Sequence, residues 1–125
     1  LFTHAQEPVW TKCVYEKEYH FAYGDKEHKQ SDGIKYCQNR YAFGFFTKNQ
    51  SEIFEIAGYS QDTTDGYMSE SFYNKKGSNS LEGDYFVTIT HSSPAKIFIQ
   101  HTKGNSGYYL IKTKQIPMVK VSRRE

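Results

Sequence analysis

Residues 81–113, LEGDYFVTITHSSPAKIFIQHTKGNSGYYLIKT, decide the fold that we expect for this chain. Three runs of apolar, β-branched and aromatic residues are separated by short breaks rich in Ser, Pro, Gly and Asn. This pattern is typical of antiparallel strands joined by tight turns. We therefore predict a meander with strands at 85–90, 97–101 and 108–111.

Length and composition indicate one folded domain covering residues 1–125. The chain is 37% hydrophobic and 24% charged, with 11 Tyr and 9 Phe, which argues against disorder and predicts an aromatic core. No run approaches the roughly 18 apolar residues of a membrane-spanning helix, so we expect no membrane association. We interpret residues 1–5 as a signal-peptide remnant and residues 115–125 as a basic tail.

One helix is predicted, at residues 32–47. Ser31 and Asp32 offer an N-cap, and an apolar residue recurs at i, i+3, i+7 and i+11 thereafter. The other predicted elements are two short N-terminal strands or a hairpin at 9–15 and 19–23, strands at 52–59 and 67–73, and loops at 24–30, 60–66 and 74–80.

Two cysteines, Cys13 and Cys37, are the only ones in the chain. A bond between them would close a loop of 23 intervening residues and stabilise the domain by roughly 3 kcal/mol in the chain-entropy model. Two buried free thiols remain the alternative. A disulfide and the glycosylation sequon at Asn49 would both fit a secreted protein.

The segment IFIQHTKGNSG at 97–107, with the strand before it and residues 108–111 after it, resembles the C-terminal half of the small secreted fungal ribonucleases, the guanyl-specific enzymes and the ribotoxins; this resemblance covers residues 81–113. The resemblance implies an α+β fold, with a single helix packed on an antiparallel sheet of about four to five strands and an N-terminal β-hairpin. It also implies that His101 matches the general acid and Glu70 the general base.

The catalytic arginine of these enzymes is missing, because Tyr85, Phe86 and Val87 stand where it is expected. A second histidine is also missing from the strand at 53–56. Losing even one charge-stabilising group typically costs about 100- to 1000-fold in rate, so we expect a pseudoenzyme in which Glu70 and His101 are vestigial.

This loss resembles a narrower group, the ribonuclease-like effectors that cereal powdery mildew fungi secrete from haustoria. That resemblance implies a secreted, monomeric protein that works in the host plant cell cytoplasm, suppresses plant immunity and is recognised by an intracellular plant immune receptor. It implies no cofactor, and the residues themselves show no metal-ligand spacing.

The predicted binding surface lies near the C-terminus, where six basic residues and no acid fall between residues 103 and 124. Such a face would contact RNA, the ribosome or an acidic partner. Histidine 91, at a strand end, is predicted to lie at the surface. The candidates for contact with RNA or a partner are His101, Lys103, Asn105, Tyr108, Tyr109, Lys112 and Lys114.

Two other functions stay open. An active ribonuclease would use Glu70 and His101, with Lys103 or Lys112 replacing the arginine. A lipocalin-like carrier of a small apolar ligand would need about eight strands and no helix in the middle of the chain.

Overall fold

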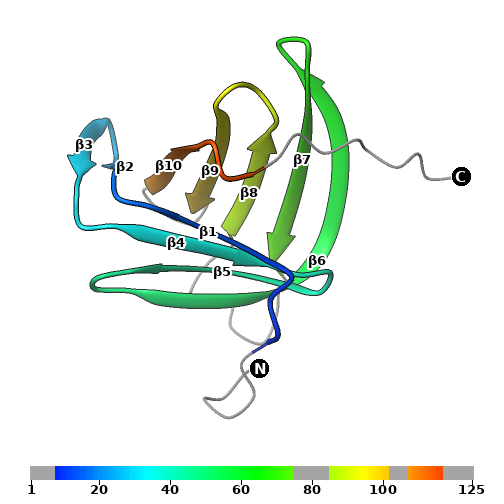
Figure 1. The fold of residues 1–125 in the computed structure, drawn as a ribbon, viewed down its shortest axis with the longest axis horizontal. Helices are drawn as coiled ribbons and strands as arrows, with labels where there is room; N and C mark the ends of the chain where they lie inside the picture. The colour runs from blue at the N-terminus through cyan, green and yellow to red at the C-terminus, as the bar shows by residue number, and fades with distance from the viewer. Residues whose placement is uncertain (1–7, 75–84, 102–106, 117–125) are drawn as a thin grey trace, which may run out of the picture.

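Ten β-strands make up the computed structural model, which describes residues 8–74, 85–101 and 107–116 (Figure 1). The described residues contain no helix. The strands are β1 (Lys12–Glu16), β2 (Tyr19–Tyr23), β3 (Lys26–Gln30), β4 (Ile34–Gln38), β5 (Ala42–Thr47), β6 (Ser51–Thr64), β7 (Tyr67–Asn74), β8 (Tyr85–Thr90), β9 (Ala95–His101) and β10 (Gly107–Thr113).

All strand pairings are antiparallel, in the order β1-β4-β5-β6-β7-β8-β9-β10-β2-β3. Strand β6 is long enough to pair first with β5 and then with β7, and its register shifts between Ile56 and Gly58. A bulge of this kind bends a strand. The sheet therefore curls into the half-barrel seen in Figure 1.

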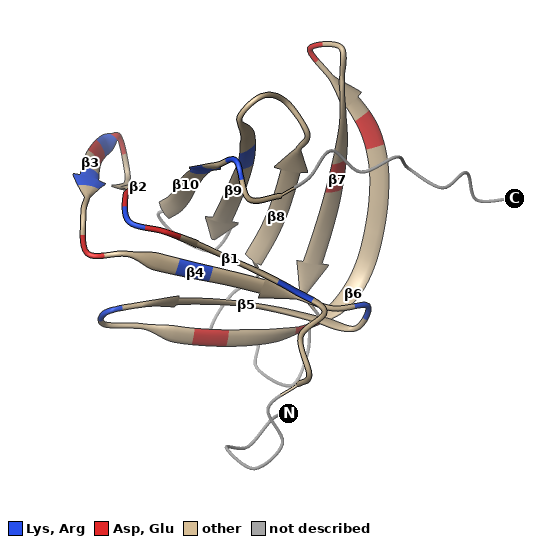
Figure 2. Cartoon of the chain, viewed as in Figure 1, with Lys and Arg blue, Asp and Glu red and all other residues tan. Residues whose placement is uncertain are grey.

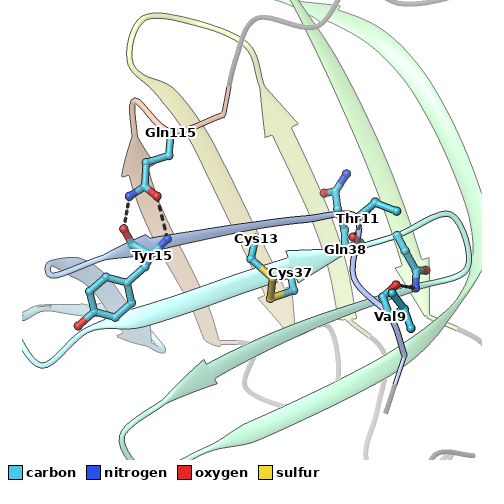
Figure 3. The surroundings of a disulfide bond; sticks show 8 residues. Val9, Thr11, Cys13, Tyr15, Cys37, Gln38 and Gln115 are labelled. Atoms are coloured by element: carbon cyan, nitrogen blue, oxygen red, sulfur yellow. Dashed lines mark hydrogen bonds between the residues drawn. A yellow bond between two sulfur atoms is a disulfide. The ribbon is translucent and has the colours of Figure 1, made fainter. Parts of the chain in front are cut away.

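The first strand of the sheet, β1, lies close to β10. Gln115, just after β10, accepts a hydrogen bond from the Tyr15 backbone N–H at 3.2 Å and donates one to the Tyr15 carbonyl (Figure 3). The Thr113 hydroxyl donates to the Glu16 carboxylate, which also accepts from Gln115 at 2.8 Å. These bonds tie edge strand β1 to the far side of the curled sheet.

Alternate residues of each strand point inward and build an aromatic core, as the composition predicts. The rings of Phe45, Phe54, Tyr85 and Tyr109 lie between 4.8 and 6.5 Å from one another where they contact. Aliphatic residues from β8, β9 and β10 complete the core: Val87, Ile89, Ile97, Ile99 and Ile111.

The predicted α+β fold is wrong, because residues 32–47 form β4 and β5 instead of a helix. The helical spacing at this segment is also compatible with strands, since Tyr36 and Phe45 are opposite each other and both point to the core. The turn between the strands is built by Asn39, whose side-chain oxygen accepts from the backbone N–H groups of Tyr41 and Ala42, each at 2.7 Å. The ribonuclease-like arrangement of one helix on a sheet therefore does not apply to this chain.

The strands predicted at 52–59, 67–73, 85–90, 97–101 and 108–111 are confirmed. The two N-terminal strands exist as β1 and β2 but do not pair with each other: β1 joins β4, and β2 joins β3 and β10. The predicted loop at 24–30 contains β3, and most of the loop at 60–66 continues β6. The loop predicted at 74–80 lies outside the described residues after Asn74.

The disulfide between Cys13 and Cys37 is present, and the alternative of two free thiols is wrong (Figure 3). The two residues are direct cross-strand neighbours in β1 and β4, with Cα atoms 4.0 Å apart. Cys37 is fully buried, but on the face of β4 opposite to the core residue Tyr36. The bond fastens edge strand β1 to the sheet.

Candidate functional site

The Glu70 carboxylate lies on the inner face of β7 and contacts His91. The Oε2 atom of Glu70 is 2.6 Å from the Nε2 atom of His91, whose side chain is 2% exposed. The prediction that His91 lies at the surface is therefore wrong. Val87 and Ile89 point inward from β8. Because side chains alternate between the two faces of a strand, His91, two residues after Ile89, also lies on the inner face.

Glu70 and His101, the predicted base and acid, do not come together. Glu70 is opposite Ile89 on β8, and Ile89 is opposite Ile97 on β9. His101 lies four residues farther along β9, which is about 13 Å at the rise of an antiparallel strand. His101 stacks on Tyr85 instead, with ring centroids 4.5 Å apart. One phosphodiester cannot contact both groups in this arrangement.

A cavity of about 120 Å³ opens beside the Glu70–His91 pair. It lies where the inner faces of β1 and β4 approach those of β7 and β8. Two apolar side chains and four polar ones line it: Ile89, Ile116, Lys12, Gln38, Glu70 and His91.

Three buried polar atoms in this region have no hydrogen-bond partner among the described residues: the Tyr36 hydroxyl, Gln38 Oε1 and His91 Nδ1. Two of them, Gln38 and His91, belong to side chains that line the cavity. Burial, and secondarily the charge of Glu70, raises the pKa of Tyr36, so its hydroxyl stays protonated at neutral pH. Unpaired buried polar atoms are uncommon and costly, which marks this region as a candidate ligand site.

The outer face of the same sheet carries a second candidate site, which we call the aromatic face: Tyr73, Phe86, Phe98 and Tyr108 on β7 to β10. Tyr73 and Phe86 stack with planes 10° apart and are 45% and 36% exposed. Phe98 and Tyr108 pack with centroids 4.9 Å apart and are half-buried. Tyr73 lies directly over Gly58, where a Cβ would come within 2.1 Å of its ring.

Two exposed lysines lie at one border of the aromatic face. Lys96 and Lys112 are directly opposite each other in β9 and β10, two residues beyond Phe98 and Leu110 (Figure 2). Like charges opposite each other destabilise a sheet, and a bound anion removes that repulsion. The lysine pair and the rings together present a positive, aromatic surface.

The structure separates the residues predicted to bind RNA or a partner. Tyr108 and Lys112 lie on the outer face, whereas Tyr109 is a core residue, 8% exposed, whose hydroxyl donates to Gln50. Lys114 is exposed just after β10. Lys103 and Asn105 lie outside the described residues. Asn49, in the predicted sequon, is exposed in the turn between β5 and β6.

In the part of the chain that the structure describes, no helix is long and apolar enough to cross a membrane, and no group of three or more metal-ligating side chains comes together. Comparison with protein-family models, with curated proteins and with solved structures finds no match to this chain.

Proposed function

We propose that this protein acts by binding, without catalysis, and that it holds single-stranded RNA across the aromatic face. The observation that carries the proposal is the row of side chains across four strands: Tyr73 opposite Phe86, Phe86 opposite Gln100, and Gln100 opposite Tyr108. Rings exposed on a sheet are platforms on which unpaired bases stack, and each stacked base contributes about 1–3 kcal/mol.

The polar groups of this face fit the rest of a nucleotide. Lys96 and Lys112 are placed to meet backbone phosphates at the border of the rings, and the Gln100 amide between two of the rings is placed to hydrogen-bond a base edge. Two phosphate contacts predict a shallow salt dependence, with a slope of log affinity against log salt of about −1.4.

The biological setting belongs to the same proposal. A disulfide-bonded chain suits secretion. Entry into a plant cell, suppression of immunity and recognition by an intracellular immune receptor are expectations from the resemblance of residues 81–113 to the ribonuclease-like effectors, and they rest on it alone. They are compatible with a protein that acts by occupying RNA.

The test is fluorescence anisotropy with a labelled single-stranded RNA of about 12 nucleotides, and a duplex of equal length as comparison. We expect the double variant Tyr73→Ala/Phe86→Ala to weaken binding at least tenfold, since about 1.4 kcal/mol is lost for even one stacked base. Gly58→Ala, which displaces the Tyr73 ring without removing it, should weaken binding to a smaller extent.

The matched control is Tyr41→Ala, which removes a tyrosine that is 70% exposed in the turn between β4 and β5 and is not part of the aromatic face. It should leave RNA binding unchanged. Equal losses in Tyr41→Ala and in Tyr73→Ala/Phe86→Ala, or equal affinity for duplex and single strand, would contradict the proposal. Cleavage of the RNA by the purified protein would overturn the absence of catalysis.

A further inference from the structure

The cavity beside Glu70 and His91 is separate from the aromatic face, since the two open on opposite faces of the sheet. Glu70 and Ile89 point inward. Their neighbours Ser71 and Thr88 point outward, and the hydroxyl oxygens of these two residues are 3.1 Å apart. A ligand in the cavity therefore touches none of the four rings outside. Its binding is independent of the function proposed above.

The hydrogen-bonding character of the cavity follows from the Glu70–His91 pair. A carboxylate 2.6 Å from Nε2 holds the imidazole proton on Nε2, so in the neutral ring the buried Nδ1 atom is a lone-pair acceptor. Gln38 Oε1 is a second buried acceptor without a partner among the described residues. Two unused acceptors on side chains that line the cavity call for a ligand that donates hydrogen bonds.

Charge and size narrow the ligand further. Lys12 also lines the cavity, so its ammonium group disfavours a cationic ligand, while the Glu70 carboxylate, already bonded to His91, disfavours an anion. A cavity of about 120 Å³ is slightly smaller than an engineered protein cavity of roughly 150 Å³ that binds benzene. Ile89 and Ile116 supply apolar walls for the faces of a ring.

We propose that this cavity binds a small, neutral, planar molecule of about the size of a six-membered ring, which donates an O–H or N–H hydrogen bond to His91 Nδ1 or Gln38 Oε1. Phenol is the simplest probe with these properties. Toluene has nearly the same shape and apolar area but no hydrogen-bond donor. It therefore distinguishes a site that accepts a hydrogen bond from a purely apolar cavity.

The experiment measures the dissociation constants of phenol and toluene by ligand-observed NMR on the full-length, oxidised protein. We expect phenol to bind at least about tenfold more tightly than toluene, the difference that one buried hydrogen bond makes. In Gln38→Leu the preference for phenol should fall by about threefold or more, because one acceptor is lost at nearly constant volume. In His91→Leu it should fall further.

Since His91→Leu leaves Glu70 without its partner and could prevent folding, the His91 acceptor is also removed in Glu70→Leu/His91→Leu, which leaves neither member of the pair unpaired; Gln38→Leu removes the unpaired Oε1 atom of Gln38. Tyr41→Ala, which changes no residue that lines the cavity, is the control and should keep the full preference. Equal affinity for phenol and toluene, no binding of either, or a preference unchanged both in Gln38→Leu and in Glu70→Leu/His91→Leu would each overturn the proposal. RNA binding by Gln38→Leu should equal that of the wild-type protein, so the two functions are tested separately.

Discussion

Breaking the buried pair of Glu70 and His91 should destabilise the protein by a measurable amount. In Glu70→Leu, the Nε2–H group of His91 loses its acceptor while the imidazole, 2% exposed, stays out of water. A hydrogen bond to a charged group contributes about 1.5–3 kcal/mol, and Glu70 is 14% exposed, so we expect a loss near 2 kcal/mol.

The thermal shift follows from chain length. At about 2.1 cal/mol/K per residue, unfolding of 125 residues has an entropy near 0.26 kcal/mol/K, so 2 kcal/mol lowers the melting temperature by roughly 8 °C. The Tyr59 hydroxyl also donates to Glu70, at 3.2 Å, but this bond is exposed. Tyr59→Phe, the matched control, should therefore cost about 0.5 kcal/mol or less.

A double-mutant cycle with Glu70→Leu, His91→Leu and both together isolates the pair. Removing both partners leaves no unpaired buried group, so the double variant should be about 2 kcal/mol more stable than the sum of the single effects predicts. The assay is urea unfolding followed by circular dichroism at equilibrium. A coupling energy below about 0.5 kcal/mol would refute the buried pair and, with it, the tautomer on which the cavity ligand depends.

Three further predictions concern the framework. Replacing Cys13 and Cys37 together by alanine should cost about 3 kcal/mol through the entropy of a loop with a sequence separation of 24, and an unchanged urea midpoint would contradict the bond. Gly44→Ala should destabilise the protein by about 2 kcal/mol, because its Cβ would come within 2.9 Å of the Glu52 carbonyl; a neutral effect in thermal melts would show that β5 and β6 are not so closely paired. Burial raises the pKa of Tyr109 to about 12, so as pH rises from 10 to 12 the unfolded state loses this proton first and the stability of the fold should fall. In urea titrations, Tyr109→Phe should lack part of that fall. An identical pH dependence in the variant and the wild-type protein would count against the buried phenol.

The meander at 85–113 could be predicted because its alternation of side chains is strict and its turn residues are unambiguous. The segment at 32–47 could not, because a short apolar run fits helical and strand spacing alike and the outcome depends on pairing. Cys37 in β4 is bonded to Cys13 in the neighbouring strand β1, and Gly44 in β5 leaves room for the close approach of β6. β1 is separated from β4 by two other strands along the chain, and β6 lies beyond the end of the segment, so no pattern within residues 32–47 contains either contact.

Of the candidate sites, too, part could be predicted from the sequence and part could not. The motif resemblance points to Glu70, which does face inward, but its partner is His91 instead of His101. The inward direction of His91 follows from continuing the alternation of β8 by one step, so the sequence contained that signal. The opposition of Lys96 and Lys112 depends on the register of β9 and β10, which only the structure defines.

The most direct test of the binding function is an amide-resolved NMR titration of the oxidised protein with a single-stranded RNA of about 12 nucleotides. The aromatic face predicts that the largest shifts fall on Tyr73, Phe86, Phe98 and Tyr108 and on the strands β7 to β10 that carry them. It also predicts little change at the Glu70–His91 cavity. Shifts centred on β3, β4 or β5, or no shifts at saturating RNA, would contradict the account.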